Sequence, residues 1–254
     1  MLVIFLMMAL FPSLIAPYDP LEQNIANRLK YPSPQHYFGT DELGRDILSR
    51  CIYGARTSVS TAIIAVVFSL FFGVSTGLLS GYLGGILDEF LSRANDLLVS
   101  FPGIIIAMAL IAITGQNPFA VAMVIGIVNM PVVFRVTRAV TLKVRTLPYV
   151  DAVRSAGASP LYIMFLTILP NCRSEIFVQA LLIASRAIIV EASLSFLGLG
   201  VPPPAPSWGS MLSKGRNYLY QMFWYGVFPG LFILVLVLSL QFMSRYLQRV
   251  ITVK

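Results

Sequence analysis

The sequence has few charged residues, few cysteines and one histidine, and each shortage excludes a class of protein. Only 11% of its 254 residues are charged, whereas a soluble domain averages about 25%. Its two cysteines, Cys51 and Cys172, do not make a zinc pattern, and the single histidine is His36. No G-x-x-x-x-G-K-[ST] stretch occurs, so the sequence lacks a P-loop for ATP. These shortages argue against an ordinary soluble domain, a cysteine zinc site and a P-loop ATPase.

Apolar residues are abundant instead, at 57% of the chain, and they form long continuous runs. A helix needs about 20 apolar residues to cross a ~30 Å hydrocarbon core. Continuous rather than alternating runs favour helices over a barrel. We therefore predict an all-α integral membrane protein whose six transmembrane helices cover residues 1–17, 57–80, 95–114, 119–140, 175–198 and 226–247.

The first run is short and invites comparison with a signal peptide. It has no basic residues at its start, and Leu14-Ile15-Ala16 is not a small-x-small cleavage site. We expect a spanning helix that starts upstream of Met1.

Lys and Arg predict the orientation, because they accumulate on the cytosolic side of membranes. Six cations lie between Arg135 and Arg173, whereas the link at residues 115–118 on the opposite side has none. With both termini inside, ten cations, Lys254 among them, lie on the inner side and seven on the outer side. We place the 141–174 loop and both termini in the cytosol, and segments 18–56 and 199–225 outside. Cys51 and Cys172 then lie on opposite sides, so no disulfide is expected.

The segment at residues 149–170 is polar, between two apolar runs, and carries helix start and stop signals. Pro148 fits a first helical position, and Gly157 suits the end of that helix. Ser159-Pro160 predicts the start of a second short helix that Pro170 ends. Ala152 and Ala156, four residues apart, give the first helix a small-residue face. This pattern predicts a docking element for a soluble partner.

Three glycines, Gly73, Gly77 and Gly81, recur every four residues in the second apolar run. Such a small-residue ridge lets helices approach closely, so we predict helix packing. The same stretch also matches G-x-S-x-G with Ser75 as nucleophile, which would make the protein an intramembrane enzyme. That pattern requires a strand-turn-helix and a histidine base, and His36 belongs to the outer segment.

Ionisable residues within the fifth apolar run are candidates for a pathway or gate. Arg186 and Glu191 are costly at membrane depth, and Ser193 and Ser195 follow them. Five residues apart, the two charges are poorly placed to pair on one helix. The alternatives are a structural polar contact between helices and a proton relay in a secondary carrier.

The two outer segments contain clusters of their own. Asp41, Glu42, Arg45 and Asp46 alternate in sign, which predicts a folded cap with local ion pairs, although three carboxylates also suit a metal ion. The second segment carries aromatic residues that suit the membrane interface. Alternatively, these aromatic residues form an outer gate or a docking surface for a protein that delivers substrate. The residues are Tyr218, Tyr220, Phe223, Trp224 and Tyr225.

Residues 149–170 resemble the cytoplasmic EAA loop of ABC importer permeases, with the pattern E-A-A-x3-G-x9-I-x-L-P. The positions that match this motif are Asp151, Ala152, Gly157, Leu169 and Pro170. The sequence departs from it mildly, with Val153 for the second Ala and Thr167 where Ile is usual.

Two further stretches narrow the resemblance. Residues 38–50 (FGTDELGRDILSR) resemble the outer signature of the dipeptide, oligopeptide and nickel permease group. Residues 191–200 (EASLSFLGLG), followed by Pro203 and the run PSWG at 206–209, resemble its C-type subunit. The similarity covers nearly the whole chain as a single transmembrane domain, residues 1–254.

The resemblance implies a type I ABC importer permease in a bacterial inner membrane, with a cytoplasmic coupling-helix loop. It implies a second, homologous permease subunit, two cytosolic ATP-binding subunits and an extracytoplasmic binding protein, and no nucleic acid. ATP and Mg²⁺ would bind the ATPase subunits, so this chain would hold no cofactor, metal or catalytic residue. Asp151 and Arg154 would contact charged groups of an ATPase subunit. Peptides are the expected substrate; a nickel or other metal chelate and glutathione are alternatives.

Overall fold

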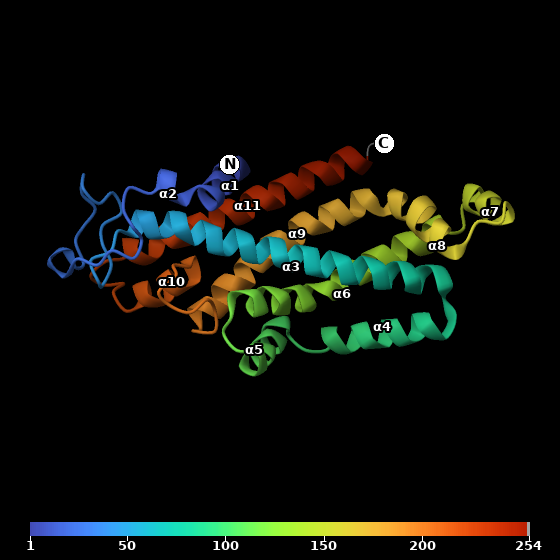
Figure 1. Cartoon of the computed structure of the whole chain (residues 1–254), viewed down its shortest axis with the longest axis horizontal. Coiled ribbons are helices and arrows are strands. Elements are labelled where there is room, and N and C mark those ends of the chain that lie inside the picture. Colours follow the sequence, from blue (N-terminus) through green and yellow to red (C-terminus); the bar gives the residue numbers. More distant parts are fainter. Residues whose placement is uncertain (253–254) are drawn as a thin grey trace.

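The computed structural model describes residues 1–252, which fold into a long bundle of helices (Figure 1). Lys254, counted above among the inner cations, lies outside the described residues. Helix α7 (Pro148–Ser155) lies at one end of the bundle, and α10 (Trp208–Arg216) lies at the opposite end (Figure 1). We call these the α7 end and the α10 end. The prediction of an all-α membrane protein is confirmed.

Four helices within residues 1–252 are long and apolar enough to cross a membrane. They are α3 (Ile47–Leu83), α6 (Pro118–Val144), α9 (Leu169–Phe196) with the short segments that precede it from Pro160, and α11 (Trp224–Thr252). Helix α3 begins ten residues before the apolar run, because the Asp46 carboxylate accepts a hydrogen bond from the Ser49 amide at 2.8 Å and caps it.

The first predicted span folds as two short helices, α1 (Leu2–Leu10) and α2 (Pro12–Ile15). Pro12 lacks the amide hydrogen that would continue α1, so the helix ends at Leu10. Nine residues rise about 14 Å, well short of a ~30 Å core. The predicted count of six spans is therefore not confirmed.

The third predicted span, residues 95–114, is not one helix. It falls on α4 (Gly85–Val99) and α5 (Gly103–Thr114), which meet at an angle of 91°. Pro102 disfavours the helical conformation of Phe101 and is the N-cap of α5, so the chain breaks before Gly103. If this bent pair counts as one span, the total is five.

Helices α3 and α6 pack along the glycine ridge. A Cβ atom at Gly73 would lie 2.6 Å from Val133, one at Gly77 would lie 2.8 Å from the Phe134 carbonyl oxygen, and one at Gly81 would lie 2.7 Å from Thr141. All three glycines thus face α6, so closely that any side chain there would force the neighbouring atoms to shift.

Apolar clusters fill the bundle at three levels. The largest lies between α1, α3, α6, α9 and α11. Cys172 belongs to a cluster at the α7 end, and Cys51 to another at the α10 end. Both cysteines are buried free thiols.

Candidate coupling site and membrane core

Helix α7 begins and ends at the predicted residues. Pro148 occupies its first turn, and Gly157 adopts the left-handed conformation at φ +83°. The Gly157 amide donates to the Arg154 carbonyl at 3.0 Å, and the Ala158 amide donates to the Val153 carbonyl at 3.4 Å. These two bonds form a Schellman cap, which satisfies carbonyls at the helix end. The predicted boundaries of the first short helix are confirmed.

The two sides of α7 differ in burial. Val150 is fully buried in the cluster at the α7 end, where Leu78 of α3 and Val144 of α6 also lie. Ala152 and Ala156 are exposed on the other side. The small-residue face is therefore open to solvent or a partner. The burial of Val150 was not predicted, although Val150 and Val153, three residues apart, were the available signal for the buried side.

Asp151 and Arg154 pair with each other. Their side chains are 60% and 50% exposed, and Arg154 Nη1 lies 2.9 Å from Asp151 Oδ1. An exposed pair of this kind contributes about 0–1 kcal/mol.

The second short helix does not end at Pro170, so that prediction is wrong. Its predicted start is confirmed, because the Ser159 hydroxyl accepts from the Tyr162 amide at 3.3 Å and caps α8 (Pro160–Tyr162). The chain then continues through a π-helix, η2 (Ile163–Ile168), directly into α9. Pro170 removes one helical donor, and the wider π turn lets the helix pass that position. Leu169 and Pro170 are thus the first turn of a spanning helix, which η2 joins without a loop to α8; residues 156–159 form the turn between α8 and α7.

The pathway candidates on α9 fall into two groups. Glu191 is fully buried, and its two oxygens accept hydrogen bonds from Ser58 of α3 at 3.0 Å and from Ser195 at 2.8 Å. Ser193 instead donates to the Ile189 carbonyl of its own helix at 2.8 Å. Arg186 is exposed and, within residues 1–252, forms no ion pair with Glu191. Ser58, missed from the sequence, is one hydroxyl among many in its apolar run.

A second polar contact missed from the sequence joins α4 to α6. Arg138 donates from two nitrogens to the Asp88 carboxylate, at 2.6 and 2.7 Å. The Ser80 hydroxyl of α3 also donates to Asp88. Bidentate guanidinium–carboxylate pairs are among the stronger hydrogen-bonded contacts. Arg138 therefore holds α4 in place besides contributing to charge bias.

The predicted cap with local ion pairs is confirmed at the α10 end. Asp41 is buried and accepts from Arg45 at 2.7 Å, and Arg45 also reaches Glu42 at 3.2 Å. Glu42 in turn accepts from Lys214 at 3.0 Å and from the Tyr225 hydroxyl at 2.5 Å. Burial raises the pKa of Glu42, but its hydrogen bonds, led by that from Tyr225, outweigh burial and hold the pKa below the usual 4.5.

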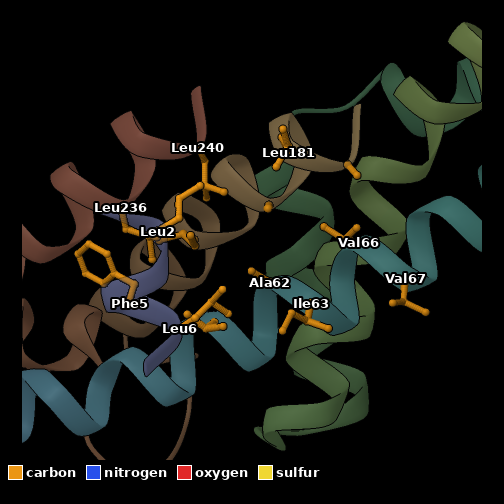
Figure 2. Close-up of a pocket in the computed structure, with 14 residues that line it drawn as sticks. Leu2, Phe5, Leu6, Ala62, Ile63, Val66, Val67, Leu181, Leu236 and Leu240 are labelled. Atoms are coloured by element: carbon orange, nitrogen blue, oxygen red, sulfur yellow. The ribbon is translucent and has the colours of Figure 1, made fainter. Parts of the chain in front are cut away.

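An apolar pocket of about 330 Å³ lies between α1, α3, α9 and α11 (Figure 2). Every residue that lines it is apolar, from Phe5 of α1 to Leu240 of α11. Because a peptide's charged termini need polar partners, this pocket does not suit a peptide.

The sequence is similar to that of known transport proteins. Residues 73–253 match the family described as "binding-protein-dependent transport system inner membrane component". The chain belongs to this family. It is 40% identical over 242 residues to the di/tripeptide transport system permease protein DppC of Pseudomonas aeruginosa (strain UCBPP-PA14), covering 93% of this chain and 80% of that protein. It is 44% identical over 248 residues to the dipeptide transport system permease protein DppC of Escherichia coli (strain K12), covering 95% and 83%.

The fold of this permease also matches solved structures. An inward-facing structure of the MetNI methionine ABC transporter superposes with a TM-score of 0.66 at 19% identity, over 80% of this chain and 97% of that one. The predicted type I ABC importer fold is confirmed, and the chain is a permease subunit of an ABC importer. Such a permease works together with other permease and ATPase subunits.

Ser75 and His36, which an intramembrane enzyme would pair, have other partners in the structure. The Ser75 hydroxyl donates to the Phe71 carbonyl of its own helix at 2.6 Å, while His36 contacts Asp46 in the cap. Arg186 and Glu191, the candidates for a proton relay, do not pair with each other: Glu191 accepts from Ser58 and Ser195, and Arg186 is exposed. Within residues 1–252, no three His, Cys, Asp or Glu side chains are arranged to hold a metal ion.

Proposed function

We propose that this permease forms one half of the membrane pathway of an ATP-driven peptide importer. A second, distinct permease subunit supplies the other half, and two cytosolic subunits bind and hydrolyse ATP with Mg²⁺. This chain is then non-catalytic and binds no cofactor of its own. The observation that carries the proposal is α7, a capped helix that exposes a small-residue face at one end of the bundle.

The connection of α7 to the membrane core supports a role in force transfer. Val150 packs α7 against the ends of α3 and α6, and η2 continues without a loop into α9. A partner that pushes on α7 therefore displaces a spanning helix through the short turn at 156–159. Asp151 and Arg154 lie exposed beside the small-residue face, where charged groups of an ATPase subunit would meet them.

The proposed orientation puts the α7 end and both termini in the cytosol. The cations of segment 141–174 support this, since that segment lies at the α7 end (Figure 1). The cap and α10 then face outward, where a binding protein would deliver substrate. Alkylation of single cysteines introduced at Thr146 and Tyr220, in intact cells, tests this placement.

A docking test follows from the exposed face of α7. Replacing Ala152 with Trp fills that face without touching the buried Val150 side, so we expect the ATPase subunits no longer to co-purify with the permease. The control is Thr114→Trp, an equally bulky change at the exposed last residue of α5. It should leave co-purification intact. Normal recovery of the ATPase subunits with A152W would contradict a docking role for this face.

The peptide assignment rests on the relatives, which are named for di- and tripeptide transport. The direct measurement is mass spectrometry of the ligand that co-purifies with the binding protein encoded beside this permease. We expect a short peptide, and ATP-dependent uptake of that peptide by the assembled complex. A metal chelate or free glutathione in that binding protein would overturn the assignment.

A further inference from the structure

The buried carboxylate of Glu191 has no role in docking or in ATP hydrolysis. It lies with 0% exposure within a spanning helix, where an ionisable group is costly unless it is hydrogen-bonded. Both oxygens are satisfied, one by Ser58 and one by Ser195. With both positions filled by hydroxyls, the carboxylate points to a connection between elements rather than to a substrate contact.

The two hydroxyls are not equivalent. Ser195 lies four residues along α9 from Glu191, so its bond stays within one helix. Ser58 belongs to α3, 133 residues away in sequence. Among the hydrogen bonds of residues 1–252, the Ser58–Glu191 bond is the side-chain bond that joins α3 to α9. Polar side chains join helices in this way inside membranes.

Further contacts tie the same region of α3 to the first residue of α10 and to the segment before it. Thr57 donates to the Pro206 carbonyl at 2.9 Å, and the Trp208 indole donates to the Cys51 carbonyl at 2.8 Å. Gly209 packs so closely against α9 that a Cβ would lie 2.3 Å from the Ala192 carbonyl oxygen. The α10 end of α9 is thus held on two sides.

Away from this joint, α3 and α9 leave space between them. The apolar pocket lies beside the Ser58–Glu191 joint, with Leu181 of α9 across from Val66 of α3 (Figure 2). A second cavity of about 350 Å³, lined by Leu70 and Leu169, follows toward the α7 end. There, Leu78 of α3 shares an apolar cluster with Ile168. Apolar contacts are non-directional, so they permit sliding that a hydrogen bond resists.

We propose that Glu191 is a positioning residue that fixes α9 to α3 at the α10 end, so that displacement of α9 at the α7 end turns it about this joint. This rests on the proposed function, in which α7 passes motion to α9. Without the joint, movement at the α7 end is taken up by slippage between the helices. ATP is then hydrolysed with less substrate carried.

Ser58 and Ser195 provide a matched pair for the test. Ser58→Ala and Ser195→Ala each remove one hydroxyl from the same carboxylate, but only S58A separates two helices. In the complete complex in lipid vesicles, we expect peptide carried per ATP hydrolysed to fall about threefold in S58A, the effect of one interhelical bond in a membrane. The fall in S195A should be clearly smaller. Equal falls in both variants, or none in S58A, would overturn the proposal.

A conservative exchange separates positioning from folding. Glu191→Gln keeps an acceptor for one hydroxyl and a donor for the other. It should therefore keep the peptide carried per ATP hydrolysed near the wild-type value. Glu191→Leu cannot form either bond and should uncouple transport at equal membrane abundance. An E191L complex with the wild-type ratio would refute the joint.

A distance measurement tests the joint without relying on transport. Spin labels are attached at two exposed positions, Arg56 of α3 and Leu197, the residue after α9. The complex also carries Cys51→Ala and Cys172→Ala, so that the native thiols are not labelled. We expect the distance distribution to broaden in S58A and stay narrow in S195A. Unchanged widths in S58A would count against the proposal. If the wild-type complex carries no peptide, the proposed function fails, while this measurement still decides the joint.

Discussion

At the scale of the residue, Gly157 shows a requirement that is purely conformational. Its φ is +83°, and no atom beyond its own and its two neighbouring residues lies within 4 Å of the position a Cβ would take. Ala at this position costs about 1 kcal/mol of left-handed strain, and Asn costs less. We expect Gly157→Ala to speed amide hydrogen exchange at residues 157 and 158 about fivefold, and Gly157→Asn to do so less. Equal exchange in all three proteins would show that the cap is not strained.

At the scale of the element, the pairing of α3 with α6 depends on close approach. A Cβ at Gly77 would lie 2.8 Å from both the Phe134 carbonyl oxygen and Thr137, so Gly77→Val should cost about 1–3 kcal/mol through overpacking. Gly230→Ala in α11 is the control, because a Cβ there meets Leu212 at an ordinary 3.8 Å. The measurement is the thermal unfolding midpoint in detergent. Similar losses in both variants would mean that the ridge does not set the helix spacing.

At the scale of the whole molecule, the α10 end is held by buried charge rather than by helix packing alone. The folded pKa of Glu42 lies below its usual 4.5, so its contacts stabilise the cap above that pH. This stabilisation is lost as the pH falls through the lowered pKa. Glu42→Gln should therefore flatten the fall of the unfolding midpoint between about pH 6 and about pH 3. The exposed Glu22→Gln is the control, and an equal flattening there would contradict this origin.

Local signals in the sequence predicted local structure well. The long apolar runs became α3, α6, α9 and α11, and the caps of α7 formed where Pro148 and Gly157 predicted. Predictions failed where a proline could either interrupt a helix or lie within a continuous one. Pro12 and Pro102 interrupt helices, whereas Pro170 lies inside a continuous one, because the π-helix before it absorbs the missing donor.

In the candidate site too, contiguous features were predictable from the sequence and contacts between helices were not. The α7 loop is contiguous, so its composition alone indicated a docking element. The partners of Glu191 and Arg138 come from other helices, and single polar residues in apolar runs do not reveal which helix they face. Hydropathy therefore located these residues in the membrane without showing their contacts.

The sequence by itself determined that this chain enters a membrane as helices, since backbone groups there must be paired within each segment. It also determined where the α7 helix begins and ends, because caps act over a few residues. The tertiary structure alone decided that α4 and α5 bend by 91°, that η2 leads without a loop into α9, and that Ser58 meets Glu191. Those features depend on which helices pack together, which no short stretch of sequence encodes.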